Sequence, residues 1–235
     1  DTLTQMADRA GFRSVVIHSS RDSMLDKQCE LTADSQALES VSVCVAAMAS
    51  NAADRYQPFN ARRDSEDQLI DRQARWLNDA ARLLAPNGLM FVYGLPRHLV
   101  RYGVALSAAL TFRYWIGVRT MSVTKSGGLR PEHSGLLVLS KPGANVNRLR
   151  IPHARCRACD NTLKDWGGKS HLMSADGVAL SDVWMDLVVD PDEQLPTELL
   201  ARILDLAANP DRTRLALLVP DAPGVSPPLY DRSTI

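Results

Sequence analysis

The sequence predicts an α/β fold built on a mostly parallel sheet, and three consecutive segments carry this prediction. Residues 41–45 (VSVCV) form an apolar run bounded by small residues, as expected for a strand that is covered on both faces. An amphipathic helix follows, and a second apolar run at 89–93 (LMFVY) predicts the next strand. Strand, helix and strand make a βαβ unit with a right-handed crossover. The apolar stripe of the helix has alternating spacings of four and three residues and consists of Ile70, Ala74, Leu77, Ala81 and Leu84.

Local signals mark the ends of this helix and a strand that precedes the unit. Residues 65–68 (SEDQ) fit a capping box, and the acids in that first turn suit the helix dipole. Residues 86–88 (PNG) stop the helix. Residues 12–18 (FRSVVIH) are rich in β-branched side chains and predict an earlier strand.

The rest of the core is expected to extend the sheet. A second helix is predicted at 97–109, followed by strands at 112–125 and 135–141 that are joined by a turn-rich connector. These two strands predict an antiparallel hairpin at the end of the sheet. A helix from Pro196 and a last apolar strand at 215–219 complete the core.

Length and charge limit the function classes. A chain of 235 residues can form one large domain with a substantial core. Its 27 Lys and Arg residues balance 27 Asp and Glu residues, so any nucleic-acid binding must come from a local patch. The longest apolar tract, 100–118, contains Arg101 and Arg113, which argues against a membrane span. With four cysteines, two of them in a CxxC, the sequence is typical of a reducing compartment and predicts a cytoplasmic protein, at the nucleoid if it binds DNA.

One segment differs in composition from the rest. From Pro142 onward the chain gathers cations with interleaved tryptophans, so we divide it into a core at 1–141, a basic insert at 142–190, a second core part at 191–219 and a flexible tail at 220–235. The candidate phosphate-binding residues of the insert are Arg148, Arg150, Arg155, Arg157, Lys164, Trp166 and Lys169. Glycines between Lys164 and Lys169 would permit close backbone approach, although the same residues could form a tight turn whose tryptophan packs on the insert.

The insert also contains a candidate metal site. Cys156 and Cys159 form half of a zinc knuckle, and His153 and His171 could complete four ligands. The alternative is a pair of free thiols in a turn. Residues 181–184 (SDVW) are interpreted as closing the insert against the sheet, with Asp182 capping a turn and Trp184 in the core.

Several motifs resemble those of the amino-methyltransferases that modify adenine or cytosine in DNA, in the permuted group whose catalytic loop precedes the cofactor loop. The resemblance covers about 39–224 and is strongest from 41 to 95. It implies a Rossmann-like methyltransferase sheet with a small recognition insert. The motifs in the later part are RPEH at 130–133, NRLR at 147–150, CRAC at 156–159, KDWGGK at 164–169 and SDVW at 181–184.

The chain departs from the family at the two loops that carry the chemistry. In the family, the loop after the first core strand reads Asp or Ser, Pro, Pro, aromatic, and it holds and stacks on a flipped base. Here the corresponding positions are Ala47, Met48, Ala49 and Ser50, which cannot perform those tasks. The family has a glycine-rich loop for S-adenosylmethionine. The corresponding stretch here contains Pro220, Asp221, a second proline at 223 and Gly224, and each proline removes a backbone N–H donor.

The resemblance and these departures together favour a catalytically degenerate protein. We expect it to bind DNA or to act as an accessory subunit beside a methyltransferase-like or other protein chain, with no methyl donor and with zinc as the candidate cofactor. An active DNA amino-methyltransferase with divergent loops is the first alternative. A structural component of a larger assembly is the second, favoured by the neutral overall charge and opposed by the basic insert.

Overall fold

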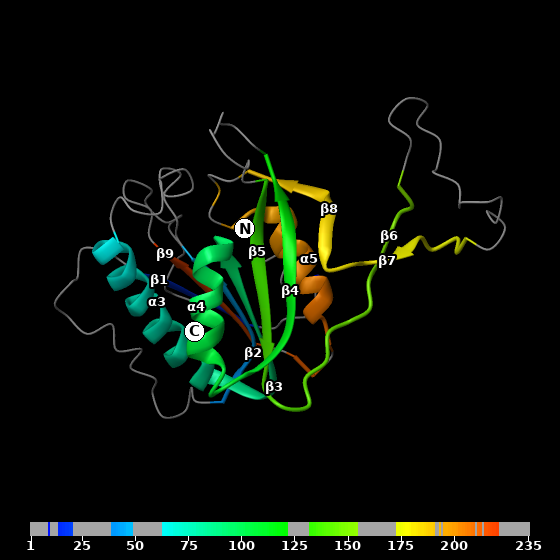
Figure 1. The fold of residues 1–235 in the computed structure, drawn as a ribbon. Coiled ribbons are helices and arrows are strands. Elements are labelled where there is room, and N and C mark those ends of the chain that lie inside the picture. Colours follow the sequence, from blue (N-terminus) through cyan, green and yellow to red (C-terminus); the bar gives the residue numbers. More distant parts are fainter. Residues whose placement is uncertain are drawn as a thin grey trace, which may run out of the picture.

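A mixed β-sheet forms the centre of the molecule (Figure 1). The computed structural model describes residues 9, 14–20, 39–48, 63–121, 132–154, 173–190, 193, 195–209, 211, 212 and 214–220. Within this part of the chain, seven strands form one sheet in the order β1-β9-β2-β3-β5-β4-β8. Their bounds are β1 Ser14–Ser20, β2 Val41–Ala47, β3 Leu84–Gly94, β4 Thr111–Thr120, β5 His133–Ser140, β8 Val183–Val189 and β9 Arg214–Pro220.

Strand directions confirm the predicted mostly parallel sheet. β1, β9, β2 and β3 are parallel neighbours, β5 runs antiparallel to both β3 and β4, and β4 pairs in parallel with β8. The predicted antiparallel hairpin of β4 and β5 is therefore present. It does not end the sheet, as the sequence suggested, because β8 pairs along the outer side of β4.

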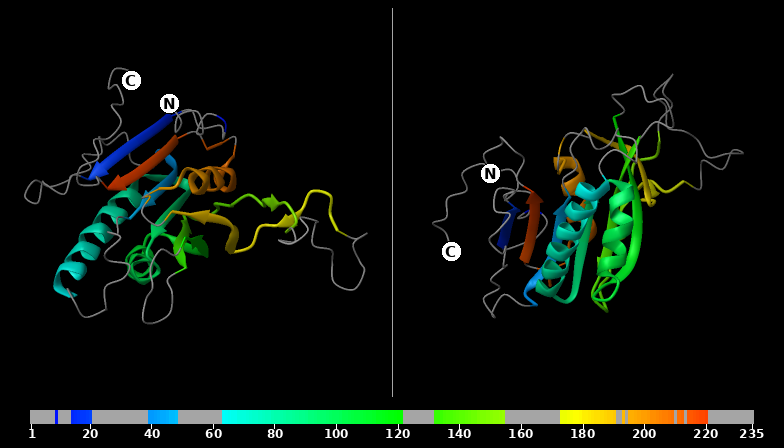
Figure 2. Two further views of the ribbon diagram at one scale, coloured as in Figure 1. Left: turned by 90° about the horizontal axis from the view of Figure 1, so that it is seen from above. Right: turned by 60° about the vertical axis from the view of Figure 1, so that its left-hand side comes forward.

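Three helices cover the two faces of the sheet in the described part of the chain: α3 Arg63–Leu83, α4 Pro96–Leu106 and α5 Thr197–Ala207. Successive side chains of β2 point to opposite faces of the sheet. Val43 and Val45 therefore join the hydrophobic core under α5, while Cys44 and Ala46 join the core under α3 and α4. Figure 2 shows α3 and α4 on one face and α5 on the other. None of the described helices is both long and apolar enough to cross a membrane.

The end of α3 differs from the prediction. Leu84, expected in the apolar stripe of the helix, begins β3 and pairs with Val41. The helix ends at Leu83, and within β3 Asn87 has a φ of 66° and the pairing with β2 shifts register between Val41 and Val43. Leu84 is fully buried, so its apolar character reflects the core and not the periodicity of a helix.

Strand β8 lies within the range that the sequence assigned to the basic insert. Residues 183–189 were placed in the insert, but they form a strand of the main sheet, with Trp184 opposite Val118. Trp184 is fully buried as expected, and its indole N–H donates to the Ser181 carbonyl at 2.9 Å. The turn before it is capped by the Ser181 hydroxyl, which accepts the Val183 N–H at 3.2 Å, and not by Asp182. The segment between the two short paired strands β6 Arg150–Ile151 and β7 Val178–Ala179 is called the basic arm below (Figure 1).

An ion pair joins β8 to α5 and predicts an acid-dependent loss of stability. Arg202 donates two hydrogen bonds to Asp186, at 3.0 and 2.6 Å, and these hold the pKa of the carboxyl below its usual value. A carboxylate with a lowered folded pKa stabilises the protein above its unfolded pKa of about 4, and this contribution is lost as the pH falls through the folded value. We expect Asp186→Asn to cost about 1 kcal/mol or less at pH 7, because the pair is partly solvated.

Urea unfolding of wild type and Asp186→Asn across pH 2–7 measures this contribution. The difference in unfolding free energy should shrink toward zero at the acid end. Asp79→Asn, which removes an exposed carboxylate from α3, is the control. A difference that is independent of pH would contradict the assignment.

Candidate functional site

The carboxyl ends of β2, β3 and β9 meet at one edge of the sheet, where parallel α/β sheets bind their ligands. Ala46 on β2 pairs with Leu218 on β9, and Ala47 pairs with Tyr93 on β3. The two loops that the resemblance singles out leave the sheet just beyond these pairs. The fold therefore brings the expected catalytic and methyl-donor positions together.

Apolar atoms fill the end of β2. Ala47 is fully buried, Met48 is 5% exposed, and the Met48 N–H donates to the Tyr93 carbonyl at 2.8 Å. Met48 packs against Gly94, where an added Cβ would lie 3.2 Å from the Met48 Cβ. These two positions offer a methyl group and a thioether, and neither can hold an amino nitrogen as a carboxylate or carbonyl oxygen does. Ala49 and Ser50 lie outside the described residues.

Strand β9 continues into the position where a glycine-rich donor loop would begin. Its parallel pairing with β1 extends from Ser14↔Arg214 to Ser20↔Pro220. Pro220 has no N–H to offer a ligand, and its φ is fixed by its ring. This end of β9 does not fit the requirement for close backbone approach to a bound donor. Asp221 and Gly224 lie outside the described residues.

A polar network between α3 and α4 was missed by sequence reasoning. His98, 3% exposed, lies with its Nε2 2.6 Å from Glu66 Oε1, and Arg97 Nε is 3.0 Å from the same oxygen. Arg101 pairs with Asp67 and Asp71. Glu66 and Asp67, which the sequence assigned to the helix dipole of α3, thus contact cationic side chains of α4 that are more than 30 positions away in the sequence. We assign this network to helix packing.

The base of the basic arm is held by its own cations. Arg150 Nη1 donates to the Gly177 carbonyl at 2.7 Å, and His153 Nε2 donates to the Ser174 carbonyl at 2.8 Å. Gly177 has a φ of 92°, and a Cβ there would lie 2.1 Å from the Ile151 carbonyl oxygen. These contacts fix where the arm starts and ends. Arg155, Arg157, Lys164, Trp166 and Lys169 lie outside the described residues, so their phosphate contacts stay predictions.

The candidate zinc site stays a prediction for the same reason. Cys156, Cys159 and His171 lie outside the described residues, and His153 is engaged with a backbone carbonyl through one ring nitrogen. Within the described ranges, no cluster of three or more His, Cys, Asp or Glu side chains could hold a metal ion.

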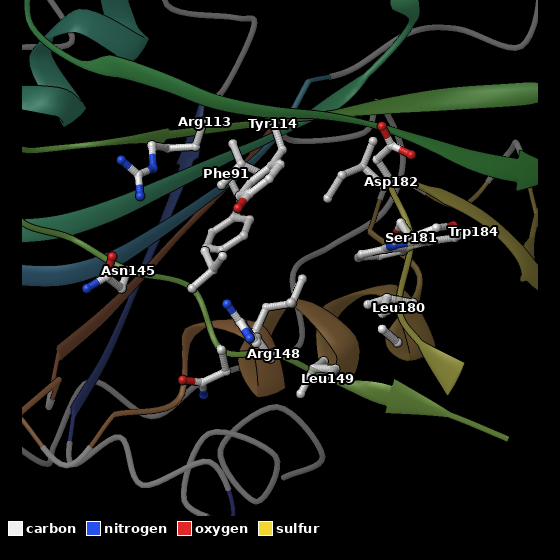
Figure 3. Close-up of a pocket in the computed structure, with 16 residues that line it drawn as sticks. Phe91, Arg113, Tyr114, Asn145, Arg148, Leu149, Leu180, Ser181, Asp182 and Trp184 are labelled. Carbon is white, nitrogen blue, oxygen red and sulfur yellow. Dashed lines mark hydrogen bonds between the residues drawn. The ribbon is translucent and has the colours of Figure 1, made fainter. Parts of the chain in front are cut away.

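A pocket of about 780 Å³ opens on the face of the sheet that α5 covers (Figure 3). Arg148, predicted as a contact of the basic insert, lines this pocket together with Arg113, Tyr114 and Asp182. Phe91 and Trp184 lie among its apolar lining residues and are fully buried. Sequence reasoning missed this pocket, because its walls come from six separate segments between positions 91 and 206.

Comparisons with known proteins find similarity to methyltransferases. No family model matches the chain. The type II methyltransferase M.BamHI of Bacillus amyloliquefaciens is 28% identical over 172 residues, which cover 65% of this chain and 41% of the relative. The chain thus spans about two fifths of the length of that relative.

Two solved structures are similar to the chain over most of its length. M1.HpyAVI in complex with SAM is 12% identical and has a TM-score of 0.48, over 87% of this chain and 92% of that chain. TTHA0409 from Thermus thermophilus, described as a DNA modification methylase, is 16% identical and has a TM-score of 0.46, over 90% of each chain.

Proposed function

We propose, from its similarity to a type II methyltransferase, that this chain is a catalytically degenerate member of the DNA amino-methyltransferases and binds DNA as an accessory subunit. It would serve a complex that modifies or processes DNA. The observation that carries the proposal is Met48, which is buried against Gly94 at the point where a base-holding loop would start.

Methyl transfer to an amino group needs oxygen acceptors that hold the nitrogen and an aromatic ring that stacks on the extruded base. Ala47 supplies neither, and the Met48 side chain is turned into the core. The residue types at positions 49 and 50, alanine and serine, also lack a ring and a carboxylate. The chain therefore lacks the groups for this reaction at the place where the fold would use them.

The methyl-donor position supports the same conclusion. Pro220 extends the strand pairing of β9 to its last residue, and Pro223 follows in the loop. Two prolines remove two backbone donors and restrict the loop that would have to wrap around a donor. We propose that S-adenosylmethionine is not a ligand of this chain.

DNA binding is assigned to the basic arm. The chain has no net charge, so attraction to phosphate must come from a local group of cations. The arm supplies Arg155, Arg157, Lys164 and Lys169 within fifteen consecutive residues, 155–169, and β6–β7 pairing holds its two ends together. Contacts of this kind position a protein on DNA and do not read its sequence.

A protein partner would find an open edge at β8. Among the described strands, β8 pairs only with β4, and its Val183 and Met185 side chains are 53% and 59% exposed. Exposed edge strands with apolar side chains are sites where another chain can associate. This edge supports the accessory-subunit part of the proposal.

DNA binding is tested by fluorescence anisotropy with a labelled duplex at several salt concentrations. We expect affinity to fall steeply between 50 and 200 mM salt, because binding releases counterions from DNA. Lys164→Ala with Lys169→Ala should weaken binding about tenfold or more at low salt and reduce the slope of log K against log salt by about 2, since each phosphate contact contributes about 0.9.

The control removes two positive charges elsewhere. Arg72→Ala with Arg75→Ala changes exposed residues of α3, on the face of the sheet opposite α5, and should leave DNA affinity within about twofold. Absence of duplex binding at low salt would overturn the DNA-binding proposal and favour the structural component. Equal losses in both double variants would also overturn it.

An active methyltransferase with divergent loops is the second candidate, and the name of the M.BamHI relative favours it. Transfer of a labelled methyl group to DNA by the purified chain would establish it. We expect no transfer, because the base-holding groups are absent from positions 47–50.

A further inference from the structure

We propose that the pocket on the α5 face of the sheet binds a nucleotide, with its base against Tyr114 and its phosphate between Arg113 and Arg148. The site is separate from the basic arm and does not depend on the proposed DNA binding. The ligand chemistry is shared by a free nucleotide and by one unit of a single strand, and the test below distinguishes the two.

A β-bulge creates one wall of the pocket. Phe112 pairs with Leu139 and Tyr114 pairs with Val138, so Arg113 is an extra residue in β4 with no partner on β5. In a regular strand, residues 113 and 114 would point to opposite faces of the sheet. The bulge allows both Arg113 and Tyr114 to line the same pocket. Figure 3 shows the two side chains on the side of the pocket that β4 forms.

The pocket is lined by one exposed aromatic ring, Tyr114, and by buried apolar side chains. Tyr114 is 44% exposed, while Phe91 and Trp184 below it are fully buried. An exposed ring beside buried apolar side chains can accept the flat face of a base, and such stacking contributes about 1–3 kcal/mol in proteins that bind single strands. The volume of about 780 Å³ is within the range of small-molecule sites.

The charge of the lining favours an anion. The charged residues that line the pocket are two arginines, Arg113 and Arg148, and one carboxylate, Asp182. In the part of the chain that the structure describes, no ion pair is formed by either guanidinium, whereas Arg202 is held by Asp186 and Arg150 by a carbonyl. Guanidinium groups bind phosphate through paired N–H donors, so two of them in one pocket suit a phosphate ester.

The wall that carries Arg148 is preformed. Asn147 donates from its side chain to the Asp205 and Ala208 carbonyls at 2.9 and 2.5 Å, and its backbone N–H donates to the Leu206 carbonyl at 2.8 Å. The segment before Arg148 is therefore anchored to the end of α5. A fixed wall lowers the entropy cost of binding.

The far end of the pocket carries a hydrogen-bond acceptor. The Asp182 carbonyl accepts the Gly117 N–H at 2.8 Å, which anchors this residue to β4, and its exposed side chain lies at the opposite end of the pocket from Arg113 (Figure 3). A carboxylate there can accept hydrogen bonds from a base amino group or a sugar hydroxyl. The pocket thus offers a separate contact to each part of a nucleotide.

This pocket is distinct from the edge where a methyl donor would bind. Strand pairing places Tyr114 level with Val138 and Phe91, whereas the edge lies at the level of Gly117, Gly135 and Gly94. The part of the pocket at Tyr114 and Phe91 is therefore displaced along the strands toward the opposite edge of the sheet, and its Asp182 end lies at the level of Gly117.

Isothermal titration tests the proposal with the full chain and four probes: AMP, CMP, ribose 5-phosphate and a single-stranded 12-mer. We expect AMP or CMP to bind with one site per chain, and ribose 5-phosphate to bind at least fivefold more weakly because it lacks the base. Arg148→Gln and Tyr114→Ala should each weaken nucleotide binding at least fivefold. Arg75→Gln, on the opposite face, should leave it unchanged, and circular dichroism verifies that each variant is folded.

The probes separate the two ligand sources. Binding of the 12-mer without binding of AMP or CMP, weakened by Arg148→Gln, assigns the nucleotide to a strand. Tyr114→Ala should not change the salt slope of duplex binding, and the Lys164 and Lys169 variants should not change AMP binding, so either proposal can fail alone. The pocket proposal is overturned if no probe binds at millimolar concentration, if the pocket variants leave all binding unchanged, or if ribose 5-phosphate binds as tightly as AMP.

Discussion

Replacement of Trp184 by alanine is expected to lower the free energy of unfolding by about 3–5 kcal/mol, the usual cost of emptying a large buried aromatic site. Trp184 is fully buried, its ring lies under Arg202 with the guanidinium carbon 5.1 Å from the ring centroid, and its strand pairs with β4. The substitution would leave a cavity between the sheet and α5. Urea unfolding followed by far-ultraviolet circular dichroism measures the change.

The next residue on β8 provides the control. Met185 is 59% exposed, and Met185→Ala should change stability by less than about 0.5 kcal/mol. A large loss for Trp184→Ala with a single cooperative transition indicates that β8 belongs to the main folding unit. If Trp184→Ala changed stability no more than Met185→Ala, the placement of β8 in the sheet would be wrong.

Replacement of Arg212 by methionine is expected to cost about 3 kcal/mol. Arg212 is 3% exposed, and its guanidinium donates to the Ala207 carbonyl at 2.9 Å and to the Asn145 carbonyl at 2.7 Å. Hydrogen bonds from charged groups contribute about 1.5–3 kcal/mol each, and methionine leaves both carbonyls without this donor. Burial also lowers the pKa of Arg212, so part of the gain is offset by the cost of desolvating the cation.

Arg214→Met, at the exposed start of β9, is the matched control and should change stability by less than about 0.5 kcal/mol. Arg212→Met should also weaken nucleotide binding, because Arg212 ties the segment of Asn145 to the end of α5. Equal stability of the two variants would contradict the role of Arg212 as a link between these segments.

Local patterns were sufficient to predict most of the elements. The apolar run at 41–45, the stripe of α3 and the helix after Pro196 each carry their own pattern, and the structure confirms all three except that Leu84 of the stripe lies in β3. Their faces are also determined locally, since alternate residues of a strand must enter opposite cores. The edge of the sheet where the family's loops meet followed from the resemblance.

Features that depend on distant contacts could not be predicted. The run at 183–189 lies within the range assigned to the insert, of which residues 181–184 were interpreted as the closing segment, and pairing with β4 reveals it as a strand. The network of Glu66 and His98 joins residues 32 positions apart. The pocket depends on a bulge at Arg113, which is visible only once β4 and β5 are in register.

Titration of the purified chain with S-adenosylmethionine tests the central claim most directly, with M1.HpyAVI, solved with this ligand, as the positive control. The proposed loss of the donor loop predicts no saturable heat at concentrations where the control is saturated. Because the donor contains adenosine but no phosphate, the same titration is run on Tyr114→Ala, which removes the proposed base contact of the pocket. Stoichiometric micromolar binding that persists in Tyr114→Ala would contradict the account.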